Sequence, residues 1–201
     1  MCGRYTFAAE QNGEAGEMLA KLNAEGHNDT IKTGEIRPTD QALILISAEK
    51  RIVSAVGRWG FPKFDGKGVI INARVETAFE KKIFRDSLVS RRCIIPSNGF
   101  YEWDRDKRQF LFHTGGAGLL YMAGIYNFYQ GQMHYVILTT QANESIRDIH
   151  DRMPLVISEQ ERDAWITDPL VAYELMKRVP PMLIKETVKK HSYGYQYRMD
   201  L

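Results

Sequence analysis

Residues 92–103 read Arg92-Cys93-Ile94-Ile95-Pro96-Ser97-Asn98-Gly99-Phe100-Tyr101-Glu102-Trp103, and they begin the densest β-type stretch of the chain. Aromatic and β-branched residues, which favour extended backbone, dominate this stretch and the segments around it. The expected strands are 92–96, 99–103, 109–113, 119–126 and 134–140, with shorter apolar segments upstream at 42–47, 52–59 and 69–72. Many strands with interspersed helices predict an α+β fold built on a largely antiparallel sheet or barrel.

Helical segments flank the β-rich stretch. Residues 8–25 have helical spacing weakened by two glycines, and residues 76–90 also have helical spacing. Residues 158–161, with the sequence Ser-Glu-Gln-Glu, have the order of a capping box. Asp168-Pro169 places an N-cap residue before a proline at the first helical position. Residues 193–198 alternate aromatic and polar side chains and are expected to form a last strand.

The composition bounds the class of protein. The chain has 201 residues, 44% hydrophobic and 26% charged, with no repeat or linker, so one domain spanning 1–201 is expected. No apolar run approaches the roughly 20 residues that span a bilayer, and no secretory signal begins the chain. These features predict a cytoplasmic protein without a membrane partner. The sequence also lacks βαβ alternation and a glycine-rich phosphate loop, which argues against a nucleotide-binding fold.

The chain has two cysteines, Cys2 and Cys93, too few for a disulfide framework and typical of a reducing compartment. Neither belongs to a C-x-x-C pair or lies near histidines with zinc spacing, so no metal or other cofactor is expected. Cys93 is followed by Ile94 and Ile95, and its simplest interpretation is a buried core thiol.

The net charge of +2 hides an uneven distribution. Residues 50–110 hold 14 of the 27 Lys and Arg residues but only 7 of the 25 Asp and Glu residues. This segment could form a face that binds a polyanion, or its charges could be scattered over a solvated surface. Charge alone favours the scattered arrangement.

The start of the chain, Met1-Cys2-Gly3-Arg4-Tyr5, offers unusual chemistry. Removal of Met1, by an aminopeptidase or by the protein itself, would leave Cys2 with a free amine and a thiol on adjacent carbons. Both groups titrate near pH 8, so a fraction of each is nucleophilic at neutral pH. An aldehyde could form an imine with the amine, and the thiol could then close a thiazolidine ring. The alternative is that the position of Cys2 is incidental.

Two segments carry polar residues where a core pattern would not place them. Asn72 follows the apolar run 69–71, and in an extended chain Asn72 and Arg74 point to the same face, where they could orient a polar ligand. Alternation places Glu102 on the face of Phe100, opposite its aromatic neighbours. Burial of that face would raise the pKa of the carboxyl and suit it to proton transfer. The alternatives are a helix start with solvated charges at 72–77 and a structural ion pair at Glu102.

Two further segments have both a functional and a structural interpretation. His150 precedes a proline-terminated turn and could act as a general acid or oxyanion donor, although a lone histidine is more often structural. Arg152 could grip phosphate oxygens bidentately. Trp59, in the run 58–62, is either a core aromatic or a platform for stacking a base or sugar, and the core is the simpler interpretation.

Five motifs occur together in a characteristic order. They are Met-Cys-Gly-Arg-Tyr at 1–5, Asn-Ala-Arg-x-Glu-Thr at 72–77, Arg-Cys-Ile-Ile-Pro at 92–96, Gly-Phe-Tyr-Glu-Trp at 99–103 and His-x-Arg-Met-Pro at 150–154. In this combination the chain resembles the SOS-response-associated peptidase (SRAP) family from residue 1 to about residue 166. The resemblance implies a single α+β domain with a barrel-like β core and peripheral helices. It also implies autocatalytic loss of Met1, binding of single-stranded DNA and covalent capture of abasic sites, as part of the response to DNA damage.

The resemblance also implies roles for individual residues. Cys2 would be the nucleophile, Asn72 would hold the N-terminal amine, Glu102 would shuttle protons and His150 would assist sugar-ring opening or imine formation. The residues expected to contact DNA are Arg4, Pro38, Trp59, Arg74 and Arg152. The chemistry agrees with this assignment, because opening the closed sugar to its aldehyde requires proton transfer that a carboxyl and an imidazole can supply. Binding of the strand should be electrostatic and salt-dependent.

The chain departs from the family where Ala-Pro is common, because it has Arg37-Pro38 there. Because of the added charge, the family pattern does not predict the shape of this part of the expected DNA-binding surface. The expected partner is single-stranded DNA with abasic sites, bound by a monomer; protein partners and cofactors are not indicated. Two alternatives remain: a cysteine peptidase that acts on other proteins, and a non-covalent single-stranded-DNA-binding module in which Cys2 is incidental.

Overall fold

The computed structural model describes residues 2–8, 13–24, 26–27, 30–116 and 118–188. The expected removal of Met1 and the expected strand at 193–198 lie outside these residues. Within the described residues the chain forms two main sheets, one of which closes into a barrel, and four α-helices around them.

Five strands close the barrel in the order β12, β4, β3, β8 and β11, and β11 pairs again with β12. Only the β12–β4 pair in this ring is parallel. Three short strands, β7, β13 and β14, pair with the outside of the ring. The strands of this sheet are β3 (Gln41–Ala48), β4 (Arg51–Trp59), β7 (Asn72–Arg74), β8 (Arg92–Ser97), β11 (Leu120–Tyr129), β12 (Gln132–Gln141), β13 (Arg152–Pro154) and β14 (Val156–Ile157).

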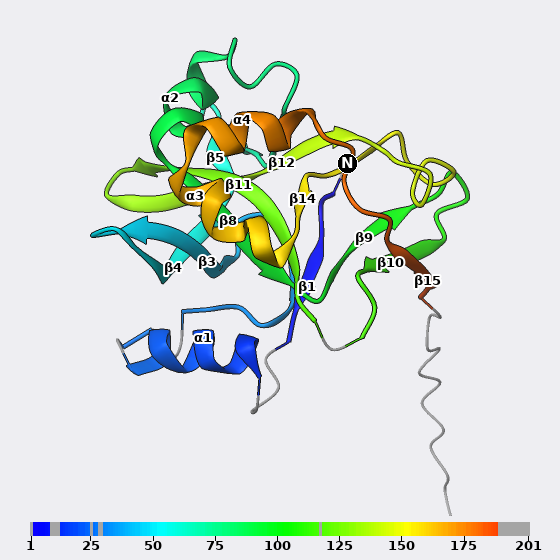
Figure 1. The fold of residues 1–201 in the computed structure, drawn as a ribbon, viewed down its shortest axis with the longest axis horizontal. Coiled ribbons are helices and arrows are strands. Elements are labelled where there is room, and N and C mark those ends of the chain that lie inside the picture. The colour runs from blue at the N-terminus through cyan, green and yellow to red at the C-terminus, as the bar shows by residue number, and fades with distance from the viewer. Residues whose placement is uncertain (1, 9–12, 25, 28–29, 117, 189–201) are drawn as a thin grey trace, which may run out of the picture.

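A second, antiparallel sheet of five strands lies beside the barrel, in the order β15, β10, β9, β1 and β2. In Figure 1 strands β9, β10 and β15 lie to the right, β3 and β4 lie to the left, and β1 runs between them. Its strands, with the small separate β5–β6 pair, are β1 (Tyr5–Phe7), β2 (Gly34–Ile36), β9 (Gly99–Trp103), β10 (Gln109–His113), β15 (Ile184–Thr187), β5 (Phe61–Pro62) and β6 (Val69–Ile70). The two sheets together confirm the predicted α+β fold with a largely antiparallel, barrel-like core.

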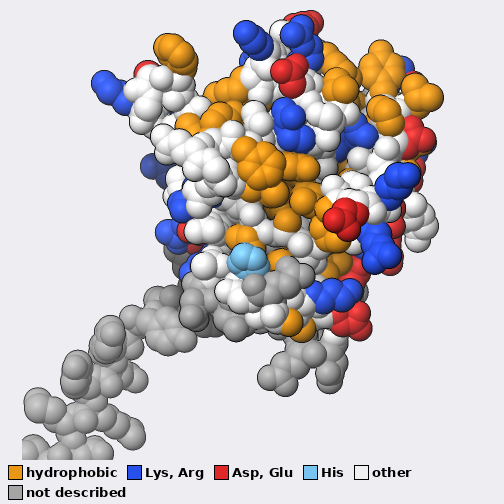
Figure 2. Space-filling view, turned by 90° about the vertical axis from the view of Figure 1, so that its left-hand side faces the viewer, with side chains coloured by type: hydrophobic (Ala, Val, Ile, Leu, Met, Phe, Trp, Pro, Cys, Tyr) orange, Lys and Arg blue, Asp and Glu red, His pale blue; other side chains and the backbone are white. Residues whose placement is uncertain are grey.

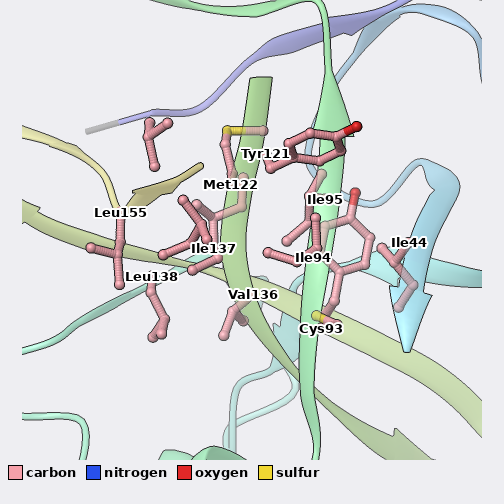
Figure 3. Packing of buried hydrophobic residues seen from close by; sticks show 14 of the residues in the cluster. Ile44, Cys93, Ile94, Ile95, Tyr121, Met122, Val136, Ile137, Leu138 and Leu155 are labelled. Carbon is pink, nitrogen blue, oxygen red and sulfur yellow. The ribbon is translucent and has the colours of Figure 1, made fainter. Parts of the chain in front are cut away.

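The barrel is held together by branched and aromatic side chains that pack against one another (Figure 3). All six residues of β8 are buried, as the apolar run 93–96 predicts for a strand covered on both sides. Cys93 is fully buried among them, which confirms its assignment to the core. The side chains labelled in Figure 3 come from β3, β8, β11 and β12 and from Leu155, whose backbone joins β11 to β12.

The helices cover the barrel with one apolar face each. α1 (Glu14–Ala24) lies below β3 and β4 in Figure 1, and α2 (Lys82–Ser90) and α4 (Pro169–Lys177) lie above the barrel strands. α1 buries residues at helical spacing, as does α2. A 3₁₀ turn, Glu159–Glu161, leads into α3 (Arg162–Thr167).

Two helix predictions need correction. The helix expected at 76–90 begins only at Lys82, because residues 75–80 form turns in which Glu76 pairs with Arg152. At the expected capping box, the Ser158 hydroxyl donates to the Glu161 carboxylate at 2.6 Å, and the Ser158 side chain does not cap the backbone. The cap at Asp168 is confirmed, since its carboxylate accepts the backbone N–H groups of residues 170 and 171.

One face of the molecule agrees with a scattered arrangement of the basic residues. On the face that carries the left-hand side of Figure 1, Lys and Arg side chains are spread around hydrophobic side chains and do not gather into one patch (Figure 2). Within the described residues, no helix has both the length and the apolar character needed to cross a bilayer.

Candidate functional site

Cys2 lies just before β1 and is fully buried. Its thiol donates to the backbone carbonyl of Arg4 over 3.7 Å, and the Asn72 side-chain amide donates to the Cys2 carbonyl at 2.9 Å. Burial raises the pKa of the Cys2 thiol well above its usual range, and the charge of Glu102 raises it further. The thiol is therefore protonated at neutral pH in this arrangement, beside a carboxyl group that can act on it.

Asn72 is brought to Cys2 by strand β7, which runs parallel to β12 with Asn72 opposite Ile137. Ala73 is buried, whereas Asn72 is half-buried and Arg74 is exposed. This alternation agrees with the prediction that Asn72 and Arg74 share a face. The strand therefore places an amide against the start of the chain and a guanidinium on the surface beside it.

Glu102 reaches the site from β9. Phe100 and Glu102 are buried and Tyr101 and Trp103 are half-buried, as the alternation predicts. Burial raises the pKa of the Glu102 carboxyl, and the charge of His150 acts in the opposite direction. The Glu102 carboxyl therefore holds its proton more tightly than an exposed glutamate does.

His150 lies at the end of a turn that precedes β13. Its Nδ1 is 3.0 Å from the backbone N–H of Arg152, which it can accept, and 2.8 Å from a carboxylate oxygen of Asp151. Nδ1 can accept the first contact or donate in the second, depending on which ring nitrogen carries the proton. The side chain is 26% exposed, which leaves it in reach of a ligand. The four residues expected to be catalytic therefore converge from the start of the chain, β7, β9 and the turn before β13.

Arg152 is placed differently from the expectation. Its guanidinium donates to both carboxylate oxygens of Glu76, at 2.6 and 2.8 Å, and to the Thr139 carbonyl at 2.7 Å. The Arg152 side chain is only 10% exposed. This pairing lowers the pKa of Glu76, since the hydrogen bonds from Arg152 stabilise the carboxylate. In this structure Arg152 braces the turn that carries His150, and a phosphate would have to take the place of Glu76 to reach it.

Trp59 also differs from the role expected of it. Its side chain has no exposed surface, its indole N–H donates to the Ile71 carbonyl at 3.0 Å, and its ring packs between Tyr5 and Tyr135. A base or sugar cannot pack on a ring that is enclosed in this way, so the core interpretation is the correct one for this structure. Its backbone still bonds to Thr39 and Asp40, and so supports the turn that carries Pro38.

Arg4 lies just before β1, and Pro38 lies just after β2. The Arg4 guanidinium lies 4.9 Å from the centre of the Trp103 ring and contacts Glu35 at 3.4 Å. Pro38 is half-buried in the turn after β2. No sequence pattern indicates Glu35, Glu76 or Trp103 as partners of the arginines, because pairing across strands depends on register that a single sequence does not state.

Within the described part of the chain, no three His, Cys, Asp or Glu side chains gather in a way that could hold a metal ion. The groups gathered at the site are a thiol, a carboxyl, an imidazole and an amide. The α+β barrel and the arrangement of these groups around a cysteine at the second position define the class of protein.

The comparison with known proteins names that class. Residues 1–191 match the family described as SOS response associated peptidase (SRAP), so the chain belongs to this family and the resemblance found in the sequence is confirmed. Among curated proteins it is similar to the abasic site processing protein YoqW of Bacillus subtilis, with 33% identity over 84% of this chain and 83% of the relative. It is also similar to the abasic site processing protein YedK of Escherichia coli, with 30% identity over 87% of this chain and 83% of the relative.

Solved structures share the fold. A protein from Bacteroides thetaiotaomicron aligns with a TM-score of 0.77 and 22% identity, over 94% of this chain and 93% of that one. A protein from Bordetella bronchiseptica aligns with a TM-score of 0.73 and 22% identity, over 94% of this chain and all of the other.

Proposed function

We propose that this chain captures abasic sites in single-stranded DNA by forming a thiazolidine between the sugar aldehyde and Cys2. The observation that carries the proposal is the placement of Cys2, with its carbonyl held by Asn72 at 2.9 Å and its thiol under the charge of Glu102. Membership of the SRAP family and the names of the relatives, abasic site processing proteins, support the same substrate.

The first step would be hydrolysis of the Met1–Cys2 peptide bond. Water adds to the Met1 carbonyl, the C–N bond breaks, and the nitrogen of Cys2 takes up a proton to become a free amine. The buried carboxyl of Glu102 suits the donation and return of that proton, because its raised pKa lies closer to neutrality. Asn72 would keep the new N-terminus in place through the Cys2 carbonyl.

The second step would join the protein to DNA. A proton transfer opens the closed sugar to its aldehyde, with His150 and Glu102 as the available acid and base. The Cys2 amine adds to the aldehyde carbon and water leaves, giving an imine. The Cys2 thiol then adds to the same carbon, its proton passes to the nitrogen, and the five-membered ring closes. The product mass equals protein plus DNA minus one water.

Arg4 and Arg74 would bind the phosphates of the strand, and Pro38 would form part of the surface beside them. Arg74 is exposed beside Asn72, and Arg4 keeps part of its guanidinium accessible. Arg152 would join them only by exchanging Glu76 for a phosphate. Intact nucleotides carry no aldehyde, so selectivity for the lesion would come from the reaction, whereas affinity for the strand would be electrostatic.

Intact-protein mass spectrometry tests the proposal. The purified chain, with C2A and C2S variants, is measured before and after mixing with single-stranded DNA that contains one abasic site. We expect the wild-type chain to lose the Met1 mass and then gain the DNA mass minus one water, in a form that survives denaturation. Chains that begin directly at residue 2, prepared for all three sequences, separate the two steps.

Three outcomes would contradict the proposal. An equal adduct in the C2A variant would assign the reaction to another residue. A wild-type chain that begins at Cys2 and forms no adduct would indicate a non-covalent binder. Turnover of a peptide substrate by that same chain would indicate a peptidase that acts on other proteins.

A further inference from the structure

Two arginines at the β1–β2 edge of the second sheet share the carboxylate of Glu35. Glu35 lies on β2 opposite Thr6 of β1, and its carboxylate contacts both Arg4, just before β1, and Arg37, just after β2. Arg37 donates to Glu35 Oε1 through both Nε and Nη2, at 2.8 and 2.5 Å. Arg4 contacts the other oxygen, Oε2, through Nη1 alone at 3.4 Å.

The two arginines do not contact this carboxylate equally. Two short contacts commit Glu35 to Arg37, whereas the single contact to Arg4 lies beyond the usual range of N–H···O hydrogen bonds. A guanidinium that is not engaged side-on by a carboxylate keeps its paired donors for another oxyanion, and phosphate fits that fork. Arg4 is therefore the arginine of this pair that is left available.

Two further contacts hold the backbone of Arg37 and the side chain of Arg4 in place. The backbone N–H of Arg37 donates to the Asp40 carboxylate at 2.8 Å, and the backbone N–H of Asp40 donates to the Arg37 carbonyl at 3.0 Å. These two hydrogen bonds hold the turn that follows Arg37. On the other side, the Arg4 guanidinium is held over the Trp103 ring.

We propose that Arg37 is a positioning residue that holds Glu35 away from Arg4 and so keeps Arg4 free for a DNA phosphate. The inference rests on the proposed function, because it takes single-stranded DNA as the ligand of Arg4. Without Arg37, the Glu35 carboxylate would turn onto Arg4 and form a bidentate pair that blocks the phosphate. Arg37 would thus serve the binding of a strand through a residue of opposite charge.

The test is a double-mutant cycle read by affinity for undamaged single-stranded DNA across a series of salt concentrations. Undamaged DNA has no aldehyde, so the covalent step does not interfere. The R37A variant is expected to bind about tenfold more weakly. The slope of log K against log salt concentration is expected to become shallower by about 0.7, the change for one lost phosphate contact on a single strand. The R37A/E35Q variant is expected to recover both values to within about twofold of the wild type, because the amide no longer competes for Arg4.

A matched pair elsewhere removes the effect of net charge. Arg178 pairs with Glu161 at nearly the same exposure, 59% and 32% for the two side chains against 62% and 34% for Arg37 and Glu35, and in this structure no second arginine among the described residues contacts Glu161. The R178A and R178A/E161Q variants change the charge identically. They are expected to alter DNA binding less than twofold.

The outcomes separate this inference from the proposed function. An R37A loss that E35Q does not rescue would make Arg37 a direct phosphate contact, and an unchanged R37A variant would leave it without a role; either overturns the inference alone. Equal losses and equal rescue in the Arg178 pair would reduce the effect to net charge and also overturn it. If the wild-type chain binds no single-stranded DNA, both the proposed function and the inference fail.

Discussion

At the scale of single residues, the environment of Glu102 decides what the site can do. A carboxylate on an exposed strand would be charged at neutral pH and a poor acid, but burial on the Phe100 side of β9 raises the pKa of Glu102. The nearby His150 moderates that shift, since its positive charge lowers the pKa of the carboxyl. The two side chains therefore interact electrostatically, as the acid–base roles proposed for them require.

The E102Q variant should separate chemistry from binding. Loss of a general acid–base group slows a reaction by about 10²- to 10⁴-fold, so both Met1 removal and adduct formation should slow by that order. Affinity for undamaged single-stranded DNA should stay within about twofold, because Glu102 is buried and faces the inner side of the sheet. Mass spectrometry over time and a binding titration measure the two. A drop in affinity with unchanged rates would make Glu102 a structural residue.

The same residue should shape the pH dependence of stability. Because the folded pKa of Glu102 is raised above its unfolded value, the folded state binds the proton more tightly. Its contribution to stability is therefore fully present below the unfolded pKa and is lost as pH rises through the folded pKa. The E102Q variant lacks this loss, so its free energy of unfolding relative to the wild type should increase with pH across that window. Urea unfolding at several pH values checks this, and parallel curves for the two proteins would contradict it.

At the scale of elements, the turn that carries Pro38 stores backbone strain. Thr39 has a φ of 78°, in the left-handed region that a β-branched residue rarely adopts. The turn persists because Thr39 N–H donates to the Trp59 carbonyl, and Arg58 donates to the Thr39 carbonyl at 2.9 Å. Hydrogen bonds to the N–H and the carbonyl of Thr39 thus hold a backbone conformation that its β-branched side chain disfavours.

Replacing Thr39 with glycine should stabilise the protein. Relief of the left-handed conformation is worth roughly 1–2 kcal/mol, and the added freedom of glycine in the unfolded chain offsets about 0.4–1 kcal/mol of it. The T39G variant should therefore gain about 0.5–1 kcal/mol in free energy of unfolding, measured by urea denaturation. The T39A variant keeps a Cβ and should gain less. A destabilised T39G variant would show that the threonine side chain makes a contribution larger than the strain.

Which elements could be predicted from the sequence follows from the range of the interactions that make them. Strands such as β8 and β9 have a period-2 or continuous apolar pattern, and the cap at Asp168 is a local signal, so all three were predictable. The β3–β4 turn was not, because Glu49 and Lys50 both have positive φ where Asn-Gly is the usual sequence. The late start of α2 was not predictable either, since it depends on Glu76 pairing with a residue 76 positions away.

At the scale of the whole molecule, closure of the barrel is the least local feature. β12 pairs with β11 on one side and with β4 and β7 on the other, and no short motif states that β12 should join strands so distant in sequence. The same closure brings Asn72 to the start of the chain, because β7 is positioned by β12. The sequence could thus indicate which residues form the candidate site, through their motifs, but not which strands bring them together or that Arg152 would be paired.

Gly124 is a point where barrel closure can be tested. It lies on β11 opposite Cys93 of β8 and Ile137 of β12. A Cβ added there would lie 2.4 Å from Ile95 Cδ1, 2.8 Å from the Val136 carbonyl oxygen and 3.0 Å from the Cys93 sulfur. The carbonyl belongs to the backbone of β12 and cannot give way without moving that strand. Only glycine allows the three strands to approach this closely.

The G124A variant should therefore lose about 1–3 kcal/mol in free energy of unfolding, the usual cost of overpacking a core. Since β12 also positions β7, the strain should reach Asn72, and adduct formation should slow by more than the loss of folded protein explains. Gly118 offers the control, because a Cβ there meets no atom within 4 Å, so G118A should be neutral in both measurements. If G124A is destabilised but its folded fraction reacts at the wild-type rate, the barrel and the site are mechanically independent, and Asn72 is held by contacts other than β12.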